Sequence, residues 1–160
     1  PIAAASTINF AESPETIFDN LQEVSPQTFV AVPRVWEKIY SQVAIRIGDA
    51  TAVQRWAYAR ALKAGEARAA CLDEDRPVPF GTRLTYGFWN MALLHNLRRM
   101  IGMDRLRRGG SGAAPISPDL LRWYQAIGVP VLEGYGMTES SGVMSINSHA
   151  NNKVGTVGPA

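Results

Sequence analysis

Residues 109–137, GGSGAAPISPDLLRWYQAIGVPVLEGYGM, decide the fold class of this chain. A short strand is predicted around Arg105–Arg108, directly before the glycine-rich turn GGSGAAP (109–115). The apolar run VPVL begins a second predicted strand over 129–136, which leads into the glycine-rich stretch EGYGMTESSG (133–142). Strand, glycine-rich turn, helix and strand form a βαβ unit, so we expect the two strands to be parallel.

The helix between these strands carries start and stop signals of its own. Ser117 can cap the first turn, Pro118 suits the first helical position, and Asp119 suits the positive end of the helix dipole. Gly128 suits the residue just past the end of a helix. The pattern therefore predicts a helix between Ser117 and Gly128.

The chain before this unit predicts further strands and helices. TFVAV (28–32) is a continuous apolar run, typical of a parallel strand covered on both faces, and TINF (7–10) predicts a strand end. Apolar spacing predicts helices that start at the SPE stretch and at Pro33, and further helices over 51–69 and 83–100. All four tryptophans are predicted to lie in the core: Trp36, Trp56, Trp89 and Trp123. The fold class is therefore α/β with a mostly parallel sheet.

The composition is that of a packed globular protein. Of 160 residues, 46% are hydrophobic and 19% charged, and the net charge of +2 is too small to indicate a nucleic-acid or membrane-surface partner by itself. No apolar run approaches the roughly 20 residues that span a bilayer. The single cysteine, Cys71, excludes an internal disulfide framework and fits a reducing compartment, so a cytoplasmic location is expected.

Both ends of the chain favour an internal segment of a longer protein. The sequence begins at Pro1 without a methionine, and KVGTVGPA (153–160) stops inside what is predicted to be a continuing glycine-rich strand region. Residues 1–160 are therefore expected to form part of one larger domain.

Both glycine-rich stretches follow predicted strands, so both are expected at the edge of a parallel sheet where ligands bind. Bare backbone at Gly112 can approach a ligand closely, and the Tyr135 ring offers a face for a purine. The Thr138 hydroxyl suits a phosphate oxygen, and the Glu139 carboxylate suits Mg²⁺. These residue types indicate a nucleotide site, although glycine-rich turns, packed tyrosines and Thr-Glu helix starts are also common without one.

The motifs YGMTES (135–140) and GGSGAAP resemble those of the adenylate-forming enzymes, which include AMP-forming acyl-CoA synthetases, luciferases and peptide-synthetase adenylation domains. PQTFVAVPRVWEKIY (26–40), LRRMIGMDRLR (97–107) and GTVG (155–158) are most similar to the long-chain fatty acyl-CoA synthetases. The resemblance covers nearly the whole chain, from INFAES (8–13) onward. It implies that the chain is part of the layered αβαβα N-terminal domain of such an enzyme.

The resemblance also implies a two-step reaction. A fatty acid carboxylate attacks the α-phosphate of ATP to give an acyl-adenylate and pyrophosphate, and the thiol of CoA then displaces AMP, with Mg²⁺ offsetting charge at the phosphate. ATP, Mg²⁺, CoA and a fatty acid are thus the implied ligands.

The family roles transfer to matching positions of the two motifs. Gly112, Ala113, Ala114 and Pro115 would line the adenine, with Glu133 and Gly134 alongside and Tyr135 stacked on it. Thr138 would bind a phosphate oxygen, Glu139 would bind Mg²⁺, and both would be catalytic. Gly134, Gly136 and Met137 would lie near the carboxylate end of the acyl chain.

Several parts of the family pattern fall outside these residues. The Ser/Thr/Gly-rich phosphate loop would lie upstream, and the aspartate for the ribose and the C-terminal domain with its lysine would lie downstream. Lys38, Lys63 and Lys153 match none of those motifs. The isolated chain is therefore expected to form no acyl-CoA.

Two other functions stay open. A fatty acyl-AMP ligase, which passes the adenylate to a carrier protein, shares the nucleotide loops, and a non-catalytic nucleotide-binding module would keep the fold. Nucleic acid is not an expected partner, since no aromatic residues alternate with the basic cluster of Arg98, Arg99, Arg105, Arg107 and Arg108. That cluster is interpreted as a solvated face, with CoA phosphates or anionic lipid as minor alternatives. Peripheral association with the inner face of a membrane is left open, as is the oligomeric state.

Overall fold

The computed structural model describes residues 7–13, 15–74, 76–137, 139, 142–147 and 155–158, without the side chains of residues 142 and 143. In chain order its elements are α1 (Ile17–Val24), β1 (Thr28–Ala31), α2 (Pro33–Gly48), α3 (Ala52–Asp73), α4 (Phe80–Trp89), the π-helical turn η2 (Asn90–Leu94), α5 (His95–Met100), β2 (Arg108–Ser111), α6 (Pro118–Ile127), β3 (Val131–Met137) and β4 (Gly142–Ile146).

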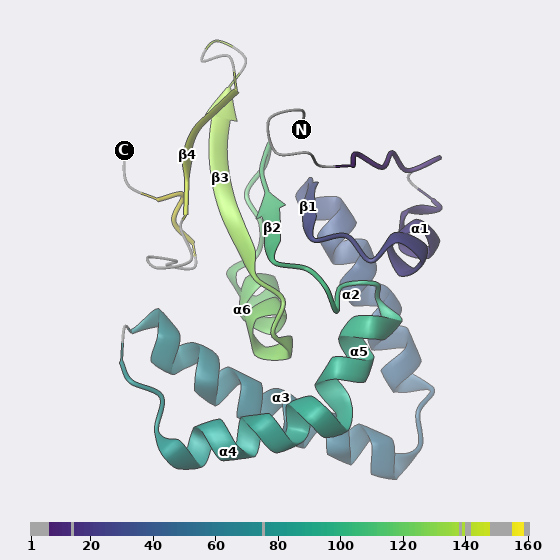
Figure 1. Ribbon diagram of the computed structural model, residues 1–160, viewed down its shortest axis with the longest axis vertical. Coiled ribbons are helices and arrows are strands. Elements are labelled where there is room, and N and C mark those ends of the chain that lie inside the picture. Colours follow the sequence, from purple (N-terminus) through teal and green to yellow (C-terminus); the bar gives the residue numbers. More distant parts are fainter. Residues whose placement is uncertain are drawn as a thin grey trace.

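The four strands form one sheet in the order β1-β2-β3-β4 (Figure 1). The first three strands are parallel, with Ser111 of β2 level with both Ala31 of β1 and Glu133 of β3. The fourth strand runs antiparallel to β3. The predicted α/β class, the mostly parallel sheet and the βαβ unit formed by β2, α6 and β3 are thus confirmed.

Helix α6 begins and ends where its sequence signals predict. Ser117 is the N-cap residue in an extended conformation, although its side chain makes no cap hydrogen bond within the described residues. Pro118 opens the helix, and Gly128 follows it with φ +83°, in the left-handed region that favours glycine. Arg98 donates from Nη1 to the carbonyl oxygen of Ile127 at 2.6 Å and from Nη2 to Asn90 at 2.8 Å. Arg98 therefore binds the carbonyl oxygen of the last residue of α6, and the interpretation of Arg98 as part of a solvated face is wrong.

The core joins the sheet to α2 and α6 through Trp36. This side chain is fully buried, and its indole nitrogen donates to the carbonyl oxygen of Gly110 in β2 at 3.2 Å. Its ring contacts Phe29 and Tyr124 edge-on, with ring centroids 5.2 and 5.0 Å apart. The Tyr124 hydroxyl donates to the carbonyl oxygen of Trp36 at 2.7 Å, and burial raises the pKa of this phenol well above its usual range, so the donor proton is retained.

Strand β2 starts three residues later than predicted, and Gly109 and Gly110 lie inside it as buried residues rather than in the turn. A Cβ on Gly109 would lie 2.4 Å from the carbonyl oxygen of Pro130 and 3.3 Å from the Trp36 ring. Because only glycine allows this approach, glycine here marks close packing. The strand predicted at TINF is also wrong: residues 7–10 form no regular structure, and their side chains are exposed.

Strand β1 is covered on one face only, contrary to the prediction for TFVAV. Phe29 and Ala31 pack partly against the core, whereas Val30 is 72% exposed. Successive side chains of a strand point to opposite faces, so the face that carries Val30 lacks a covering layer among the described residues. An apolar run predicts that a strand is buried, but it does not show which element packs over each face of the strand.

The helix predicted at the SPE stretch begins later, at Ile17, because Ser13 and Thr16 hydrogen-bond to each other in a turn. The backbone nitrogen of Ser13 donates to the Thr16 hydroxyl at 3.2 Å, and that of Thr16 to the Ser13 hydroxyl at 3.3 Å. Pro14 lies outside the described residues. The helix ends at Val24, before Pro26.

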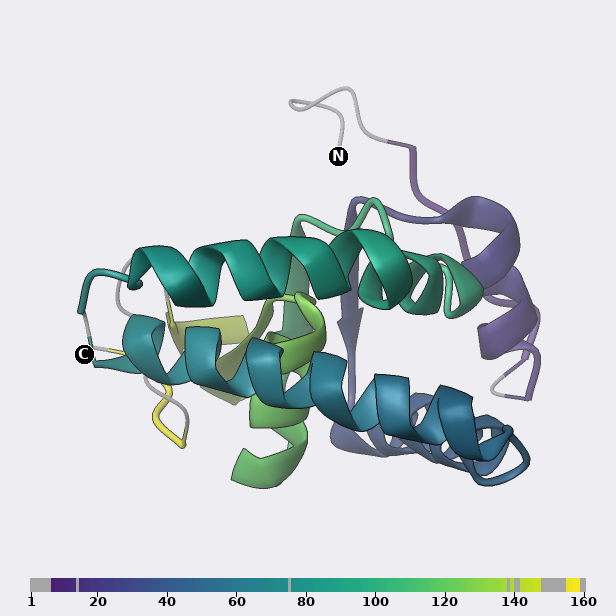
Figure 2. The same ribbon diagram turned by 90° about the horizontal axis from the view of Figure 1, so that it is seen from below.

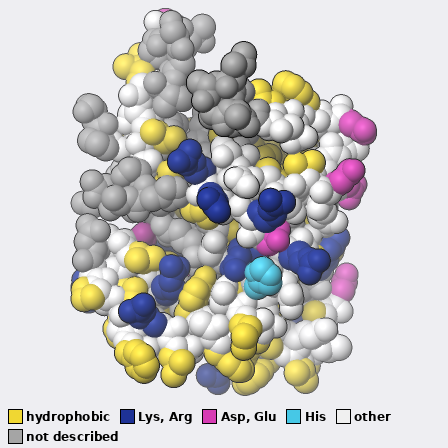
Figure 3. All heavy atoms as spheres, viewed as in Figure 1, with side chains coloured by type: hydrophobic (Ala, Val, Ile, Leu, Met, Phe, Trp, Pro, Cys, Tyr) yellow, Lys and Arg dark blue, Asp and Glu magenta, His cyan; other side chains and the backbone are white. Residues whose placement is uncertain are grey.

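Helices α3 and α4 lie side by side and nearly antiparallel (Figure 2). Both were predicted, and Thr51 starts α3 with a capping box shared with Gln54. The predicted core is wrong at Trp56, whose side chain is exposed. Leu84 and Phe88, in the helix predicted over 83–100, are exposed as well. Hydrophobic side chains gather along the lower edge of the molecule, over these helices (Figure 3). A helical period identifies a face but cannot tell whether anything covers it.

The contact between α3 and α6 predicts an unusual response to substitution. A Cβ on Gly65 of α3 would lie 2.0 Å from the carbonyl oxygen of Ala126 in α6. Gly65→Ala is therefore expected to lower the free energy of unfolding by about 1–3 kcal/mol, even though alanine favours helix. Urea unfolding measures this change.

The matched control is Gly87→Ala in α4, where an added Cβ meets nothing within 4 Å. That variant is expected to gain about 0.5–1 kcal/mol from helix propensity alone. Equal shifts of the same sign in both variants would contradict the proposed close packing of α3 on α6.

Candidate nucleotide-binding site

The predicted site segments meet at the carboxyl edge of the parallel strands. Gly112–Pro115 directly follows β2, and Glu133 of β3 is paired with Ser111, the last residue of β2. A Cβ on Gly112 would lie 3.3 Å from the carbonyl oxygen of Gly134, so the two segments are in contact there. Two stretches about twenty residues apart are thus brought together, as expected of strands joined by a parallel crossover.

The strand predicted over 129–136 is observed as β3 over Val131–Met137, and the stretch EGYGM is its second half. It extends the strand because β4 pairs with it: Gly134 lies level with Ile146, and Tyr135 with Ser145. The pairing shifts between Tyr135 and Gly136, a bulge-like irregularity that changes how the following side chains are directed. Tyr135 and Met137 are exposed, so both side chains are accessible at this edge.

Glu133 differs from its neighbours because its side chain is buried and already bonded. Its carboxylate accepts a hydrogen bond from the backbone nitrogen of Gly155 at 2.8 Å. Its backbone carbonyl oxygen accepts one from the backbone nitrogen of Asn147 at 3.0 Å. Asn147 is buried too, and donates from its side chain to the carbonyl oxygen of Thr156. These bonds hold the GTVG segment beside β3 and β4.

Sequence reasoning missed Asn147, because a single asparagine after a short apolar run carries no distinctive spacing. It also missed Ser111, which is 4% exposed and whose hydroxyl has no hydrogen-bond partner within the described part of the chain. An unpaired buried hydroxyl is costly, so it is a candidate to bond a ligand at the end of β2. The serine inside GGSGAAP was the signal that could have identified it.

The two residues predicted to serve phosphate and metal follow β3. Thr138 lies outside the described residues, whereas Glu139 is described and its side chain is exposed. Within the described ranges no three or more His, Cys, Asp or Glu side chains lie close enough together to hold a metal ion. A single exposed carboxylate fits Mg²⁺, which is normally held by one or two carboxylates together with phosphate oxygens of a substrate.

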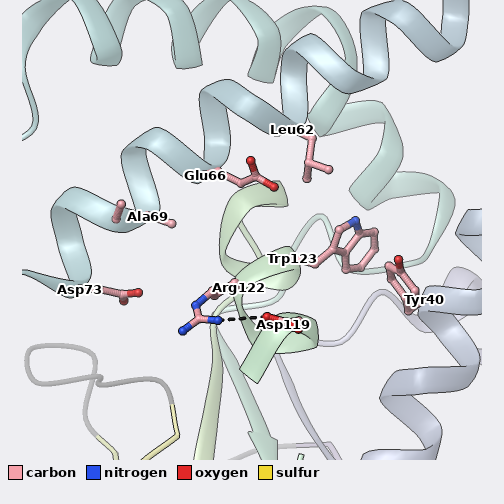
Figure 4. A pocket seen from close by; sticks show the side chains of 9 residues that line it. Tyr40, Leu62, Glu66, Ala69, Asp73, Asp119, Arg122 and Trp123 are labelled. Carbon is pink, nitrogen blue, oxygen red and sulfur yellow. Dashed lines mark hydrogen bonds and ion pairs between the residues drawn. The ribbon is translucent and has the colours of Figure 1, made fainter. Parts of the chain in front are cut away.

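A pocket of about 480 Å³ lies elsewhere, between α3 and α6 (Figure 4). Trp123 and Tyr40 line one side of it, and Asp119 and Arg122 form an ion pair at 3.0 Å on another. None of the predicted nucleotide residues lines this pocket. The nucleotide prediction therefore concerns the open sheet edge and not this pocket.

Comparison with known proteins adds independent findings. A family model described as AMP-binding enzyme matches residues 1–160. The long-chain-fatty-acid–CoA ligase ACSBG2 of Gallus gallus is 31% identical over 151 residues, which cover 92% of this chain and 19% of that protein. The putative fatty-acid–CoA ligase fadD11 of Mycobacterium tuberculosis is 33% identical over 144 residues, which cover 89% of this chain and 25% of that protein.

A plant relative is similar over the same region. The peroxisomal long chain acyl-CoA synthetase 7 of Arabidopsis thaliana is 28% identical over 143 residues, which cover 89% of this chain and 19% of that protein. The chain thus spans about a fifth to a quarter of the length of these relatives. No solved structure matches the chain significantly.

Proposed function

Because the chain belongs to the AMP-binding enzyme family, we propose that it forms part of the N-terminal domain of a long-chain fatty acid–CoA ligase. The observation that carries this proposal is the parallel pairing of β2 with β3, which sets Gly112–Pro115 beside the exposed end of β3. The fatty-acyl substrate is supported by the relatives, which are described as fatty-acid–CoA ligases. The phosphate loop, the ribose aspartate and the C-terminal lysine domain belong to the parts of the protein beyond this chain.

The adenine site is proposed along the two strand ends. Gly112, Ala113, Ala114 and Pro115 line one side of the base, where the lack of large side chains leaves room for a flat ring. Glu133 and Gly134 lie alongside, and the exposed ring of Tyr135 stacks on the purine. The bonds that Glu133 already makes keep its side chain in place, so its contribution is to shape the site rather than to move.

The phosphate and metal residues come next along the chain. Thr138 donates its hydroxyl to a phosphate oxygen, and Glu139 is the Mg²⁺ ligand. When bound, this Mg²⁺ supplies positive charge that offsets the negative charge of the phosphates. Gly134, Gly136 and Met137 lie near the carboxylate end of the acyl chain, where small residues admit the carboxylate and Met137 offers an apolar contact.

The chemistry follows from holding two substrates together. The fatty acid carboxylate forms a bond to the α-phosphorus of ATP as the bond to pyrophosphate breaks, which gives the acyl-adenylate. The sulfur of CoA then bonds to the acyl carbon, and AMP leaves. In both steps these residues orient the nucleotide and bind its phosphates, and such positioning accounts for much of the rate in transfers of this kind.

The full-length protein should be tested with ATP, Mg²⁺ and palmitate, with and without CoA. Palmitate-dependent release of pyrophosphate followed by palmitoyl-CoA formation is expected. Pyrophosphate release with acyl transfer to a carrier protein but none to CoA would instead identify a fatty acyl-AMP ligase. Nucleotide binding without palmitate-dependent pyrophosphate release would indicate a non-catalytic module and overturn the proposal.

A further inference from the structure

The pocket between α3 and α6 differs in charge from the chain around it. Its charged lining consists of three carboxylates and one guanidinium, those of Glu66, Asp73, Asp119 and Arg122. Asp119 and Arg122 pair with each other at 3.0 Å, so their charges cancel. The pocket therefore keeps two negative charges, although the whole chain carries a net charge of +2.

Helix α3 separates its charged residues by sign. Its sequence holds four basic residues and only two acidic ones. Both acidic residues, Glu66 and Asp73, line the pocket, and none of the basic ones does. Neither carboxylate forms an ion pair with another described residue, and that of Asp73 accepts a hydrogen bond from the Gln125 amide at 3.1 Å. Two carboxylates thus face an open pocket without a cation.

The rest of the lining is apolar or aromatic, from Tyr40, Leu62, Ala69, Ala70 and Trp123. The two alanines lie between the acidic residues along α3. At the Leu62 end the rings of Tyr40 and Trp123 meet edge-on, with centroids 4.9 Å apart (Figure 4). The Trp123 nitrogen already donates to the Tyr58 hydroxyl at 2.7 Å, so this wall offers rings rather than donors. Aromatic faces attract organic cations, and alanine side chains accept methylene groups.

The spacing of the two acidic residues selects the shape of the cation. Glu66 and Asp73 are seven residues apart, nearly two helical turns, so they share one face of α3 about 10 Å apart along its axis. That separation is too long for both carboxylates to bind one metal ion. Within the described ranges no three metal-binding side chains gather here either. An elongated cation with a positive group at each end fits instead.

We propose that this pocket binds an aliphatic polyamine. One terminal ammonium group pairs with Asp73, the methylene groups lie over Ala69 and Ala70, and the other end pairs with Glu66 near the aromatic wall. The volume of about 480 Å³ is ordinary for a small-molecule site. Because none of the proposed nucleotide residues lines the pocket, this inference does not depend on the proposed ligase activity.

Calorimetric titration of spermidine into the full-length protein tests the proposal. Saturable binding of one spermidine per chain is expected, and at least about fivefold weaker binding of putrescine, which is too short to reach both carboxylates. The double variant Glu66→Gln and Asp73→Asn should bind spermidine about tenfold more weakly, because both ion pairs are lost. Tyr40→Leu should weaken binding about threefold through loss of its ring.

The matched control is the double variant Asp19→Asn and Glu23→Gln. It removes the same charge from two exposed positions on α1, which line no part of the pocket. This variant should bind spermidine like the unchanged protein. The pocket variant should keep its Tm, because Glu66 is exposed and an asparagine at position 73 still offers an oxygen to Gln125.

Three results would overturn the proposal. Equal spermidine binding by the pocket variant and the unchanged protein, or equal losses in the pocket and α1 variants, would indicate general attraction to negative surface. Equal affinities for putrescine and spermidine would contradict a site with two charged ends. Binding of Mg²⁺ that the pocket variant loses, without binding of spermidine, would assign the pocket to a metal ion. Palmitate-dependent pyrophosphate release, assayed without polyamine, tests the ligase activity separately.

Discussion

Glu139→Gln in the full-length enzyme is expected to lower acyl-adenylate formation by about a hundredfold or more, with the fold unchanged. The substitution keeps the size of the side chain but removes the charge proposed to bind Mg²⁺, and a bound metal contributes several kcal/mol of charge stabilisation. The Glu139 side chain is exposed, so no packing is lost. Palmitate-dependent exchange of pyrophosphate into ATP measures the step directly.

The control for this variant is Glu37→Gln, another exposed glutamate, which lies on α2. It should leave the exchange rate unchanged. A metal role also predicts that the Mg²⁺ concentration needed for half-maximal rate rises in Glu139→Gln, which a purely structural role would not produce. Activity retained within a few fold at every Mg²⁺ concentration would refute the role of Glu139 as metal ligand.

Trp36→Ala is expected to lower the free energy of unfolding by about 3–5 kcal/mol, the usual cost of removing a large buried aromatic side chain. Trp36 is fully buried, contacts Phe29 and Tyr124, and bonds the carbonyl oxygen of Gly110. The same substitution should disturb the nucleotide edge, because Gly110 lies two residues before Gly112. Denaturant unfolding measures the first effect, and affinity for ATP measures the second.

Trp56→Ala is the matched control, because it removes the same side chain from an exposed position. Its cost should stay near 1 kcal/mol or less, because only its surface contacts with Trp89 and Arg60 are lost. Trp36→Phe separates packing from hydrogen bonding, since it keeps a buried ring but leaves the Gly110 carbonyl without its donor. Equal losses for Trp36→Ala and Trp56→Ala would contradict the central role of Trp36.

Several features could be predicted from sequence because they depend on neighbours along the chain. Ser117, Pro118 and Gly128 bound α6 through local backbone preferences, and the order of strand, helix and strand makes β2 and β3 parallel. The same order predicts that the two glycine-rich stretches share one sheet edge. Their contact, with Gly112 against the Gly134 carbonyl, agrees with that prediction.

Other features depend on residues far away in the sequence, and there the predictions failed. The strand over 129–136 was predicted, but its antiparallel partner β4 (Gly142–Ile146) was not. Gly109 and Gly110 resemble a turn, yet they lie in β2, where Pro130 and Trp36 occupy the space that a Cβ on Gly109 would need. Glycine alone does not distinguish freedom of the backbone from close approach by a neighbour.

The sequence by itself determined the α/β class, the βαβ unit and the family, since local propensities and motifs depend on residues that are close together in the chain. Only the tertiary structure decided which apolar faces are covered: Trp36 is buried while Trp56, Val30 and Leu84 are exposed. It also decided that Arg98 caps α6 and that Glu133 holds the GTVG segment. The physical reason is that burial and hydrogen bonding depend on contacts with residues far away in the sequence. The periodicity of a helix or strand identifies its apolar face but not the element that packs against that face.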